Sequence, residues 1–375
     1  MRILYFSRDY TPHDHRFLAA LTQTEHKIYF LRLENRGQSR EDRPLPAGIE
    51  IIPWAGNQKP ARLSDAPRLL FDLKRVIREV KPDLIHAGPL QRSAFLAALT
   101  GFQPLVSMSW GYDLLLDAKR SHWWERATRY TLKHSAAFVG DCDTIRDLAI
   151  GYGMSPERII TFPWGVDLDH FSPTPRTSSA AIRQRLGWEE DAFVLLSTRG
   201  WSPIYGVEDV AHAFVQAARQ HPDLRLLMLG NGPQAGIIHR IFSQAKVIDK
   251  VHFPGFIGKE KLADYYRTAD LYVSASHSDG SSISLLEALA CGTPVLLSDI
   301  PGNREWIIRG EEEGYVGWLF QEGDSAGLAS SILNALHAQA KLPQMGCAAR
   351  LLAEKRANWE QNFPELLRAY QLALG

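Results

Sequence analysis

Short apolar runs alternate with longer amphipathic segments along the whole 375-residue chain. The runs have the length of buried strands, and several of the segments between them have helical periodicity. In the first half, strands are expected over residues 2–7, 27–33, 83–87, 104–109 and 136–140, and helices over residues 68–80 and 91–100. This alternation predicts an α/β fold in which a parallel sheet carries helices on both faces, the doubly wound or Rossmann-like arrangement.

The second half repeats the alternation, with strands expected over residues 192–197, 224–229, 251–253, 269–275 and 295–298. Residues 171–179 are rich in proline and serine and are interpreted as a linker. We therefore expect two doubly wound domains, residues 1–172 and 173–356, whose sheets face each other across a cleft. A helical tail, residues 357–375, is expected to break or restart at Pro364 and is a candidate to complete the first domain.

Composition excludes several classes of protein. Acidic and basic residues are equal in number, 42 of each, which argues against a general nucleic-acid-binding protein. The three cysteines, Cys142, Cys291 and Cys347, are far apart and odd in number, so we expect a reducing compartment. No apolar run approaches the ~18 residues needed to cross a bilayer, and the first residues have a strand pattern rather than that of a signal peptide. We expect a soluble, cytoplasmic protein.

Two acids flank a turn and an expected helix start in the segment Asp-Gly-Ser-Ser-Ile-Ser-Leu-Leu-Glu, from Asp279 to Glu287. Gly280 is the flexible point of the turn, and Ser281 or Ser282 can cap the helix. Helix starts in a parallel sheet lie at the carboxyl ends of strands, where backbone N–H groups favour a phosphate. Asp279 can accept hydrogen bonds from sugar hydroxyls, and Glu287 can reach a ribose. On spacing alone, a surface aspartate and an ordinary helical glutamate explain the pattern equally well.

In its context, this segment resembles the retaining, nucleotide-sugar-dependent glycosyltransferases of the GT-B fold, called group 1 or family 4. Their paired acids are written Glu-Gly-Phe-Gly-x-x-x-x-Glu, which corresponds here to residues 279–287. The resemblance covers most of the second domain and several points of the first. The other matching segments, in an order that makes the set specific, are Gly165-Val-Asp167, Leu229-Gly-Asn-Gly-Pro233, Val251-His-Phe-Pro-Gly255, Tyr265-Tyr-Arg-Thr-Ala-Asp270, Glu287-Ala-Leu-Ala-Cys-Gly-Thr-Pro-Val295, Gly302-Asn-Arg-Glu305 and Gly317-Trp-Leu-Phe320.

The resemblance implies a hexosyltransferase that moves a sugar from a UDP- or GDP-sugar to a glycan, lipid-linked or small-molecule acceptor, as in polysaccharide biosynthesis. It implies no metal and no cofactor beyond the donor substrate, which would bind the second domain while the acceptor binds the first. Glu287 would hold the ribose, Asp279 would contact the transferred sugar, and Arg199 would neutralise the diphosphate leaving group. The other implied donor-site positions are glycines and backbone N–H groups: Gly230, Gly232, Gly280, Ser281 and Ser282.

Two features of the donor side depart from the family. Asp279 is one methylene shorter than the usual glutamate. The family arginine is normally followed five residues later by Lys-Gly, whereas Arg199 is followed by Tyr205 and a glycine, with one extra residue and no lysine. Lys259 or Lys261 is a candidate to supply the missing charge.

The first domain departs as well. Trp110 stands where the family often has histidine, so the catalytic role of that histidine does not transfer, and the nearby Asp113 becomes a candidate catalytic residue. His13, His15 and Arg16 follow the first strand in a segment expected to be a loop. A role in the cleft and a solvated loop explain that segment equally well.

Residues 119–133 mix basic and aromatic side chains. They form either an interfacial helix on the inner membrane face, suited to a lipid-linked acceptor, or an ordinary helix that packs Trp123 or Trp124 inward. The ordinary helix is favoured. Two rival functions remain open: a nucleotide-sugar epimerase or hydrolase, which would turn over the donor without an acceptor, and a non-catalytic nucleotide-sugar-binding protein, which would not turn it over at all.

Overall fold

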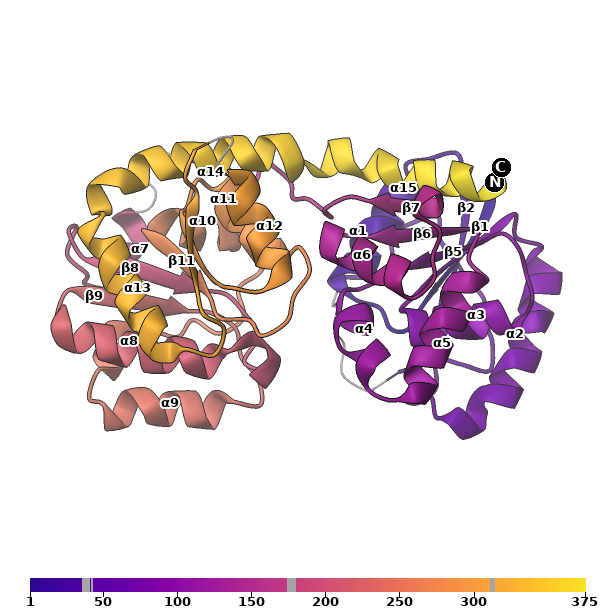
Figure 1. Cartoon of the computed structure of the whole chain (residues 1–375), viewed down its shortest axis with the longest axis horizontal. Coiled ribbons are helices and arrows are strands. Elements are labelled where there is room, and N and C mark those ends of the chain that lie inside the picture. The colour runs from indigo at the N-terminus through magenta and orange to yellow at the C-terminus, as the bar shows by residue number, and fades with distance from the viewer. Residues whose placement is uncertain (36–40, 42, 174–179, 311–313) are drawn as a thin grey trace. The chain divides into compact units, whose positions relative to one another are not determined.

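The computed structural model describes residues 1–35, 41, 43–173, 180–310 and 314–375 (Figure 1). Its contacts divide the chain into two compact units. Unit 1 consists of residues 1–162 together with residues 363–375, and unit 2 of residues 163–362. The chain therefore returns to unit 1 at its C-terminal end, within helix α15 (Trp359–Leu374).

Unit 1 is built on a seven-stranded sheet in the order β3-β2-β1-β4-β5-β6-β7, in which every pair is parallel. The strands are β1 (Arg2–Ser7), β2 (Lys27–Arg32), β3 (Glu50–Ile51), β4 (Leu84–Gly88), β5 (Leu105–Met108), β6 (Ala137–Gly140) and β7 (Ile159–Thr161). The helices are α1 (Pro12–Leu21), α2 (Ala66–Val80), the π-helix η2 (Leu90–Ala94), α3 (Phe95–Leu99), α4 (Tyr112–Leu115), α5 (His122–Lys133) and α6 (Asp143–Gly151), with short 3-10 turns η1 (Leu63–Asp65), η3 (Asp117–Lys119) and η4 (Pro156–Arg158).

Unit 2 has a six-stranded parallel sheet in the order β10-β9-β8-β11-β12-β13. The strands are β8 (Phe193–Ser197), β9 (Leu224–Met228), β10 (Val251–His252), β11 (Leu271–Ser274), β12 (Val295–Ser298) and β13 (Gly317–Phe320). The helices are α7 (Ala180–Arg185), α8 (Val207–Gln220), α9 (Ala235–Gln244), α10 (Lys259–Thr268), α11 (Ile283–Ala290), α12 (Pro301–Gly310), α13 (Ser325–His337) and α14 (Leu342–Arg356), with 3-10 turns η5 (Pro203–Tyr205), η6 (Ile248–Lys250) and η7 (Gln339–Lys341).

Strand β8 shows why the unit 2 sheet carries helices on both faces. Its alternate side chains point to opposite faces, and all of them are buried. Phe193 and Leu195 pack into a core with α8 and α13, whereas Val194 and Leu196 pack into a second core with α11 and α14. The predicted doubly wound α/β fold is confirmed.

Each sheet has one point at which the strand order reverses. It lies between β1 and β4 in unit 1 and between β8 and β11 in unit 2. Loops that leave neighbouring strands in opposite directions open a crevice there, and ligands of doubly wound sheets bind in it.

The boundary between the units differs from the expected one at residue 172, because the segment after Pro163 packs on unit 2. The Val166 N–H donates to the Ala357 carbonyl at 2.6 Å. Phe171, expected at the start of the linker, is instead a buried core residue whose ring lies 6.1 Å from that of Tyr266. Most of the expected linker, residues 174–179, lies outside the described residues.

The expected break at Pro364 is wrong, since α15 continues through it. A proline inside a helix removes one backbone hydrogen bond. Here the following turns are anchored by the fully buried side chains of Leu366, Ala369 and Tyr370, so the helix persists.

The loop expected to carry His13, His15 and Arg16 is mostly helix α1. The Thr11 hydroxyl accepts from the Asp14 N–H at 3.3 Å, and the Asp14 carboxylate accepts from the Thr11 N–H at 2.9 Å. This reciprocal pair is a capping box with aspartate in place of the usual glutamate. The Thr-Pro-x-Asp signal was present in the sequence and could have predicted the helix start.

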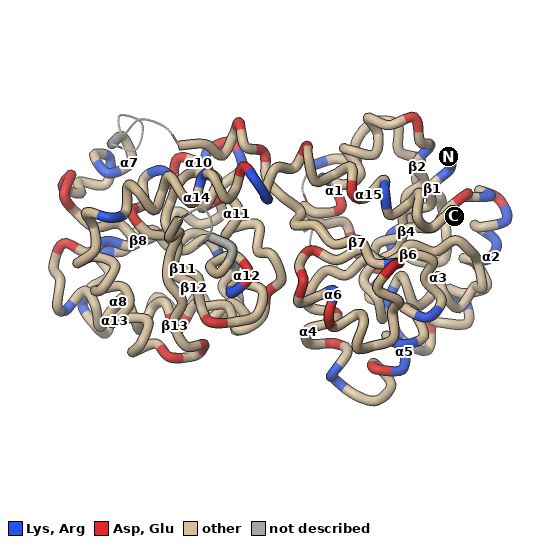
Figure 2. The backbone as a smooth tube through the Cα atoms, turned by 45° about the horizontal axis from the view of Figure 1, so that its top comes forward, with Lys and Arg blue, Asp and Glu red and all other residues tan. Residues whose placement is uncertain are grey.

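Lysine and arginine residues are interspersed with aspartate and glutamate along the backbone of both units (Figure 2), in keeping with the zero net charge. Among the described residues, no helix combines the length and the apolar character required to cross a membrane.

Candidate functional site

The strand ends at the switch point of unit 2 bring together the predicted Arg199, Asp279 and Ser282. Arg199 follows β8, and the other two residues lie between β11 and α11. One terminal nitrogen of Arg199 lies 2.6 Å from Asp279 Oδ2, and the other donates to Ser282 Oγ at 2.6 Å. The two charged side chains are only 11% and 21% exposed. A guanidinium is therefore held, largely out of water, at the predicted ligand position.

The charges of this ion pair depend on each other. Burial raises the pKa of Asp279, and the positive charge of Arg199 opposes that rise. Burial alone would lower the pKa of Arg199, but Asp279 and the nearby tyrosines outweigh it, so the pKa is raised. Arg199 thus stays cationic, and its Nε is a buried nitrogen without a hydrogen-bond partner.

Tyr205 stands near the position at which the family has lysine, and the structure gives it a specific contact. Its ring centre lies 4.1 Å from the Arg199 guanidinium carbon. A cation over an aromatic face is held by the negative charge density of the ring. Tyr205 therefore supports the guanidinium without adding a second positive charge, and Lys259, one candidate for that charge, instead pairs with Asp167 at 3.5 Å.

The start of helix α11 is also organised as predicted, with one difference. Ser282 is the residue before the helix, but its side chain makes no capping bond, because its hydroxyl accepts from Arg199. Ser281 Oγ accepts from Trp306 Nε1 at 3.2 Å. A Cβ on Gly302, at the start of α12, would lie 2.7 Å from the carbonyl oxygens of both Asp279 and Gly280. The close packing of α12 therefore fixes the loop that carries Asp279.

Glu287 lies in α11, and its position depends on a residue that the sequence did not single out. The Tyr266 hydroxyl donates to Glu287 Oε2 at 2.8 Å and lies 3.1 Å from Thr198 Oγ1. Burial, followed by the charge of Glu287, raises the pKa of Tyr266 well above its usual value, so the hydroxyl remains a donor. Thr198 precedes Arg199, and Tyr266 thus links the Arg199 loop to Glu287. It was visible only as one letter of the motif at residues 265–270.

Gly230 and Gly232 follow β9 and lie against the loop that contains Arg199. Gly230 has a φ of +93°, and an added Cβ would lie 3.0 Å from the Arg199 carbonyl oxygen. An added Cβ on Gly232 would overlap the carbonyl oxygen of Trp201. Glycine is required at these positions because two loops meet there backbone to backbone.

Two family models match consecutive parts of the chain. Residues 178–352 match the model described as glycosyl transferases group 1, and residues 13–170 match glycosyltransferase family 4. Together they span most of the chain, including the whole of the site above. The chain belongs to the group 1 glycosyltransferases.

Curated relatives of this family differ in their named activities. The chain is 32% identical over 240 residues to the D-inositol 3-phosphate glycosyltransferase of Geodermatophilus obscurus, a match that covers 62% of this chain and 51% of the relative. It is 26% identical over 326 residues to the sulfoquinovosyl transferase SQD2 of Arabidopsis thaliana, covering 82% and 60%. The matches to the inositol phosphate enzymes thus span about half the length of those relatives.

Solved glycosyltransferase structures share the fold over their whole length. The structure of Anabaena HepE in complex with UDP matches with a TM-score of 0.79 at 19% identity, covering 99% of this chain and 100% of that chain. WaaG, a glycosyltransferase involved in lipopolysaccharide biosynthesis, matches with a TM-score of 0.72 at 17% identity, covering 100% of both chains. The GT-B fold is thereby confirmed.

Asp113, the predicted catalytic residue in unit 1, is fully buried. Its Oδ1 accepts from Ser109 Oγ at 2.6 Å and from the Trp110 N–H at 3.1 Å, and its Oδ2 accepts from the Leu90 N–H at 3.0 Å. Burial raises its pKa to about 6, although these hydrogen bonds oppose the rise. These hydrogen bonds favour a structural role, in which Asp113 holds the segment at Ser109 and Trp110 against η2, rather than direct contact with a substrate.

The remaining candidates of unit 1 are also engaged locally. The His15 ring Nδ1 lies 2.6 Å from the Tyr10 hydroxyl, and the His13 ring centre lies 5.6 Å from that of Trp110. In α5, Trp124 is half-buried whereas Trp123 is 41% exposed, as in an ordinary amphipathic helix. Among the described residues, no group of three or more metal-ligating side chains is found.

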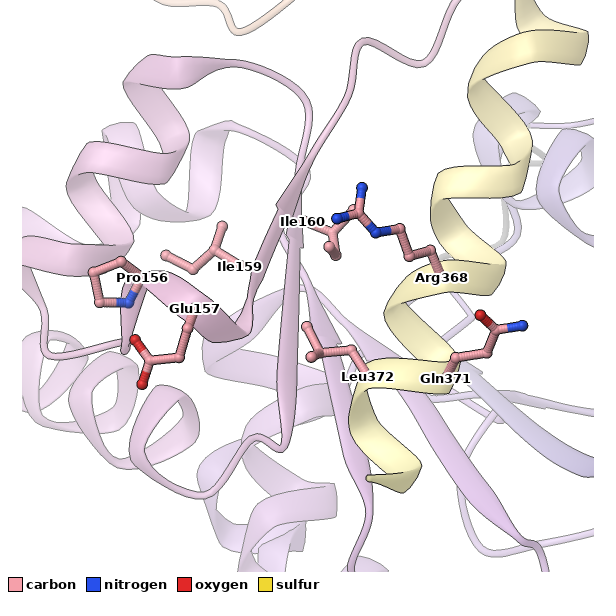
Figure 3. Close-up of a pocket in the computed structure, with 7 residues that line it drawn as sticks. All are labelled: Pro156, Glu157, Ile159, Ile160, Arg368, Gln371 and Leu372. Carbon is pink, nitrogen blue, oxygen red and sulfur yellow. The ribbon is translucent and has the colours of Figure 1, made fainter.

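A pocket of about 420 Å³ lies beside the C-terminal helix (Figure 3). Ile159 and Ile160 of β7 line it together with Arg368, Gln371 and Leu372 of α15. It contains none of the predicted site residues and lies at the amino end of an edge strand. Ligands of this kind of sheet bind at the carboxyl ends, so the pocket is not the candidate site.

Proposed function

We propose that this chain transfers a hexose from a nucleoside diphosphate sugar to an acceptor hydroxyl, with retention of the anomeric configuration. The Arg199–Asp279–Ser282 cluster at the switch point of unit 2 carries this proposal. The structural relatives captured with UDP or UDP-glucose support a nucleotide-sugar donor, and the names of the curated relatives support glycosyl transfer.

Each group of the site has a distinct task in this proposal. Arg199 and the N–H groups at the start of α11 take the diphosphate, because a guanidinium fork and a helix N-terminus both bind phosphate oxygens. Asp279 accepts hydrogen bonds from hydroxyls of the transferred sugar. Glu287, oriented by Tyr266, accepts hydrogen bonds from the ribose.

The chemistry follows from where charge develops. As the bond between the anomeric carbon and the phosphate oxygen breaks, negative charge collects on the departing nucleoside diphosphate, and Arg199 stabilises it. The acceptor hydroxyl attacks the oxocarbenium-like carbon from the same face and gives its proton to the leaving phosphate oxygen. The cation is supplied by a side chain that is already in place, so we expect no requirement for an added metal ion.

The test is calorimetric titration of the protein with UDP-, GDP- and ADP-sugars. We expect selective binding of one base, and Glu287→Ala should weaken it about 10- to 100-fold, since a hydrogen bond to a charged group is worth about 1.5–3 kcal/mol. Glu260→Ala, an exposed glutamate of α10 in the same unit, is the matched control and should bind as wild type. Absence of binding to every nucleotide sugar would refute the donor site.

Product analysis separates the rival functions. Transfer of radiolabelled sugar to an added acceptor supports the transferase, whereas conversion or hydrolysis of the donor at an equal rate without any acceptor supports an epimerase or hydrolase. Binding without turnover across a broad set of acceptors supports a nucleotide-sugar-binding protein.

A further inference from the structure

The switch point of unit 1 also holds cationic side chains. Arg8 directly follows β1, and its backbone N–H donates to the Gly88 carbonyl, at the end of β4, at 3.2 Å. Arg92 lies in η2, just beyond β4. The two arginines thus leave the two strands between which the order of this sheet reverses, as Arg199 and the Asp279 loop do in unit 2.

Arg92 is a half-buried guanidinium. No described acid lies within ion-pairing distance of it, and its Nε is a buried nitrogen without a hydrogen-bond partner. Its guanidinium carbon lies 4.9 Å from the centre of a Trp124 ring. Burial lowers the pKa of Arg92 and the charge of Arg8 lowers it further, while the charges of Glu34 and Asp117, beyond ion-pairing distance, act in the opposite direction. A charge withdrawn from water without a partner costs free energy, so an anion bound there would be stabilised.

The neighbouring arginines, unlike Arg92, each have a carboxylate within ion-pairing distance. Arg8 pairs with the carboxylate of Glu34, which is only 2% exposed. Arg120, which also lies over the Trp124 ring, is 3.9 Å from Asp117. Arg92 is therefore the member of this arginine cluster that has no ion pair with a described residue.

Tyr112 adds a neutral donor to this group. Its hydroxyl oxygen accepts from Arg8 at 3.5 Å. Burial raises the pKa of Tyr112 to about 12, so the hydroxyl keeps its proton. With the oxygen accepting from the guanidinium, the O–H is left to donate to an anionic oxygen.

The element that carries Arg92 is held firmly. It is a short π-helix, a conformation that is rare and is frequently found at functional sites. The buried Asp113 carboxylate accepts from the Leu90 N–H at 3.0 Å, and Gln91 Nε2 donates to the Asp113 carbonyl at 2.8 Å and to Thr128 Oγ1 at 2.7 Å. Asp113 therefore acts as a positioning residue for the turn that presents Arg92.

We propose that Arg8, Arg92 and Tyr112 form an anion site at the switch point of unit 1, and that its ligand is a phosphate group of the acceptor. Guanidinium forks from two strand ends and one hydroxyl offer donors from several directions, which suits the tetrahedral oxygens of phosphate better than a planar carboxylate. The assignment to the acceptor rests on the proposed function, whereas the anion site itself does not.

The experiment titrates the full-length protein with inorganic phosphate at constant ionic strength, because screening would otherwise change with each addition. Arg92→Gln should weaken phosphate binding at least 10-fold, and Arg92→Lys, which keeps the charge without the fork, should fall between that variant and wild type. Arg129→Gln is the matched control: it removes an arginine of the same unit that also lies over an aromatic ring, that of Tyr152 at 5.2 Å. It should bind phosphate as wild type does.

The melting temperature of Arg92→Gln controls for unfolding: Arg92 makes no ion pair with a described residue, so the variant loses mainly the contact with the Trp124 ring, and we expect no large change. Equal phosphate binding by Arg92→Gln and wild type would overturn the proposal. So would phosphate binding that is lost only in Arg199→Gln, because phosphate would then occupy the donor site alone.

Nucleotide-sugar binding should survive Arg92→Gln. If it is absent in wild type while Arg92-dependent phosphate binding persists, the proposed function fails and the anion site stands.

Two further titrations distinguish the source of the phosphate. Glycerol 3-phosphate represents a soluble phosphorylated acceptor, and vesicles of phosphatidylcholine with phosphatidylglycerol represent a lipid headgroup. The source is the probe whose binding weakens at least 10-fold in Arg92→Gln. If neither probe depends on Arg92, the assignment of this site to a phosphorylated acceptor is overturned.

Discussion

The ion pair between Arg199 and Asp279 should couple the stability of unit 2 to its binding of nucleotides. Both side chains are largely withdrawn from water and lie 2.6 Å apart. Arg199→Gln would leave a buried carboxylate without its partner, which typically costs about 3–5 kcal/mol. Asp279→Asn would leave a buried guanidinium and should cost a similar amount. The double variant carries two neutral amides, and we expect it to lose no more than about 1–2 kcal/mol, because a buried ion pair replaced as a whole is often nearly neutral.

The assay is urea unfolding of wild type, both single variants and the double variant, followed by tryptophan fluorescence and circular dichroism. Two units can unfold separately, so Leu73→Ala, which removes a fully buried side chain of α2, serves to identify the transition of unit 1. From these costs we expect a coupling free energy of at least about 4 kcal/mol from the cycle. The cost of Arg199→Gln should shrink at acid pH, because burial already raises the pKa of Asp279 and the protonated acid needs no partner.

The two single variants should change the affinity for nucleoside diphosphate in opposite directions. In the free protein, Asp279 binds one terminal nitrogen of the Arg199 guanidinium, and Asp279→Asn makes that nitrogen available to the diphosphate. We expect Asp279→Asn to bind free nucleoside diphosphate about 2- to 10-fold more tightly while transfer of the sugar is lost, and Arg199→Gln to bind it at least about 10-fold more weakly. A coupling free energy near zero, together with equal nucleotide binding by all four proteins, would refute the buried pair and its role.

Three further outcomes are expected. Tyr266→Phe removes the donor to Glu287 and should weaken nucleotide-sugar binding by calorimetry about 5- to 10-fold, as for the loss of about 1–1.5 kcal/mol from one hydrogen bond; unchanged affinity would contradict the orienting role. Gly302→Ala should displace the loop that carries Asp279, lower the free energy of unfolding in urea by about 1–3 kcal/mol and weaken donor binding. The control is Gly236→Ala on α9, where an added Cβ meets nothing within 4 Å, and it should stabilise the protein by about 0.5–1 kcal/mol. Burial lowers the pKa of His86 to about 3, whereas the histidine of the unfolded chain binds its proton near pH 6.5. The contribution of His86 to the free energy of unfolding is therefore full above pH 6.5 and falls by about 2 kcal/mol at pH 5. In His86→Gln this decrease should be absent. Parallel pH profiles for wild type and His86→Gln would show that the histidine is not held neutral.

The local pattern of apolar residues was enough to predict most of the strands. Ten strands were expected from short apolar runs, and the structure has a strand at each of those places. Three strands of the described part of the chain were missed, β3, β7 and β13, and all three lie at sheet edges, where a strand has a neighbour on one side only. Edge strands are short and less uniformly buried, so their apolar pattern is weak.

The loop between β11 and α11, which belongs to the proposed donor site, was predictable because its signals also lie close together in the sequence. The turn at Gly280, the residue before α11 and the two acids all follow from spacing within one segment, and the structure places Ser282 as expected. What the sequence could not supply was the partner of each group. Asp279 is paired with Arg199, 80 residues away, and Glu287 accepts from Tyr266 in the preceding helix.

The sequence by itself thus determined two doubly wound units and the residue types of the proposed donor site, because strand, turn and helix-start signals act between near neighbours in the chain. Tertiary structure decided which charges are paired and which are not. It placed Asp113 in a buried hydrogen-bonding role, and it left Arg92 without a described carboxylate partner at the switch point of unit 1. Ionic and hydrogen-bonded partnerships arise between strand ends that are brought together only when the sheet forms, and no spacing along the chain records them.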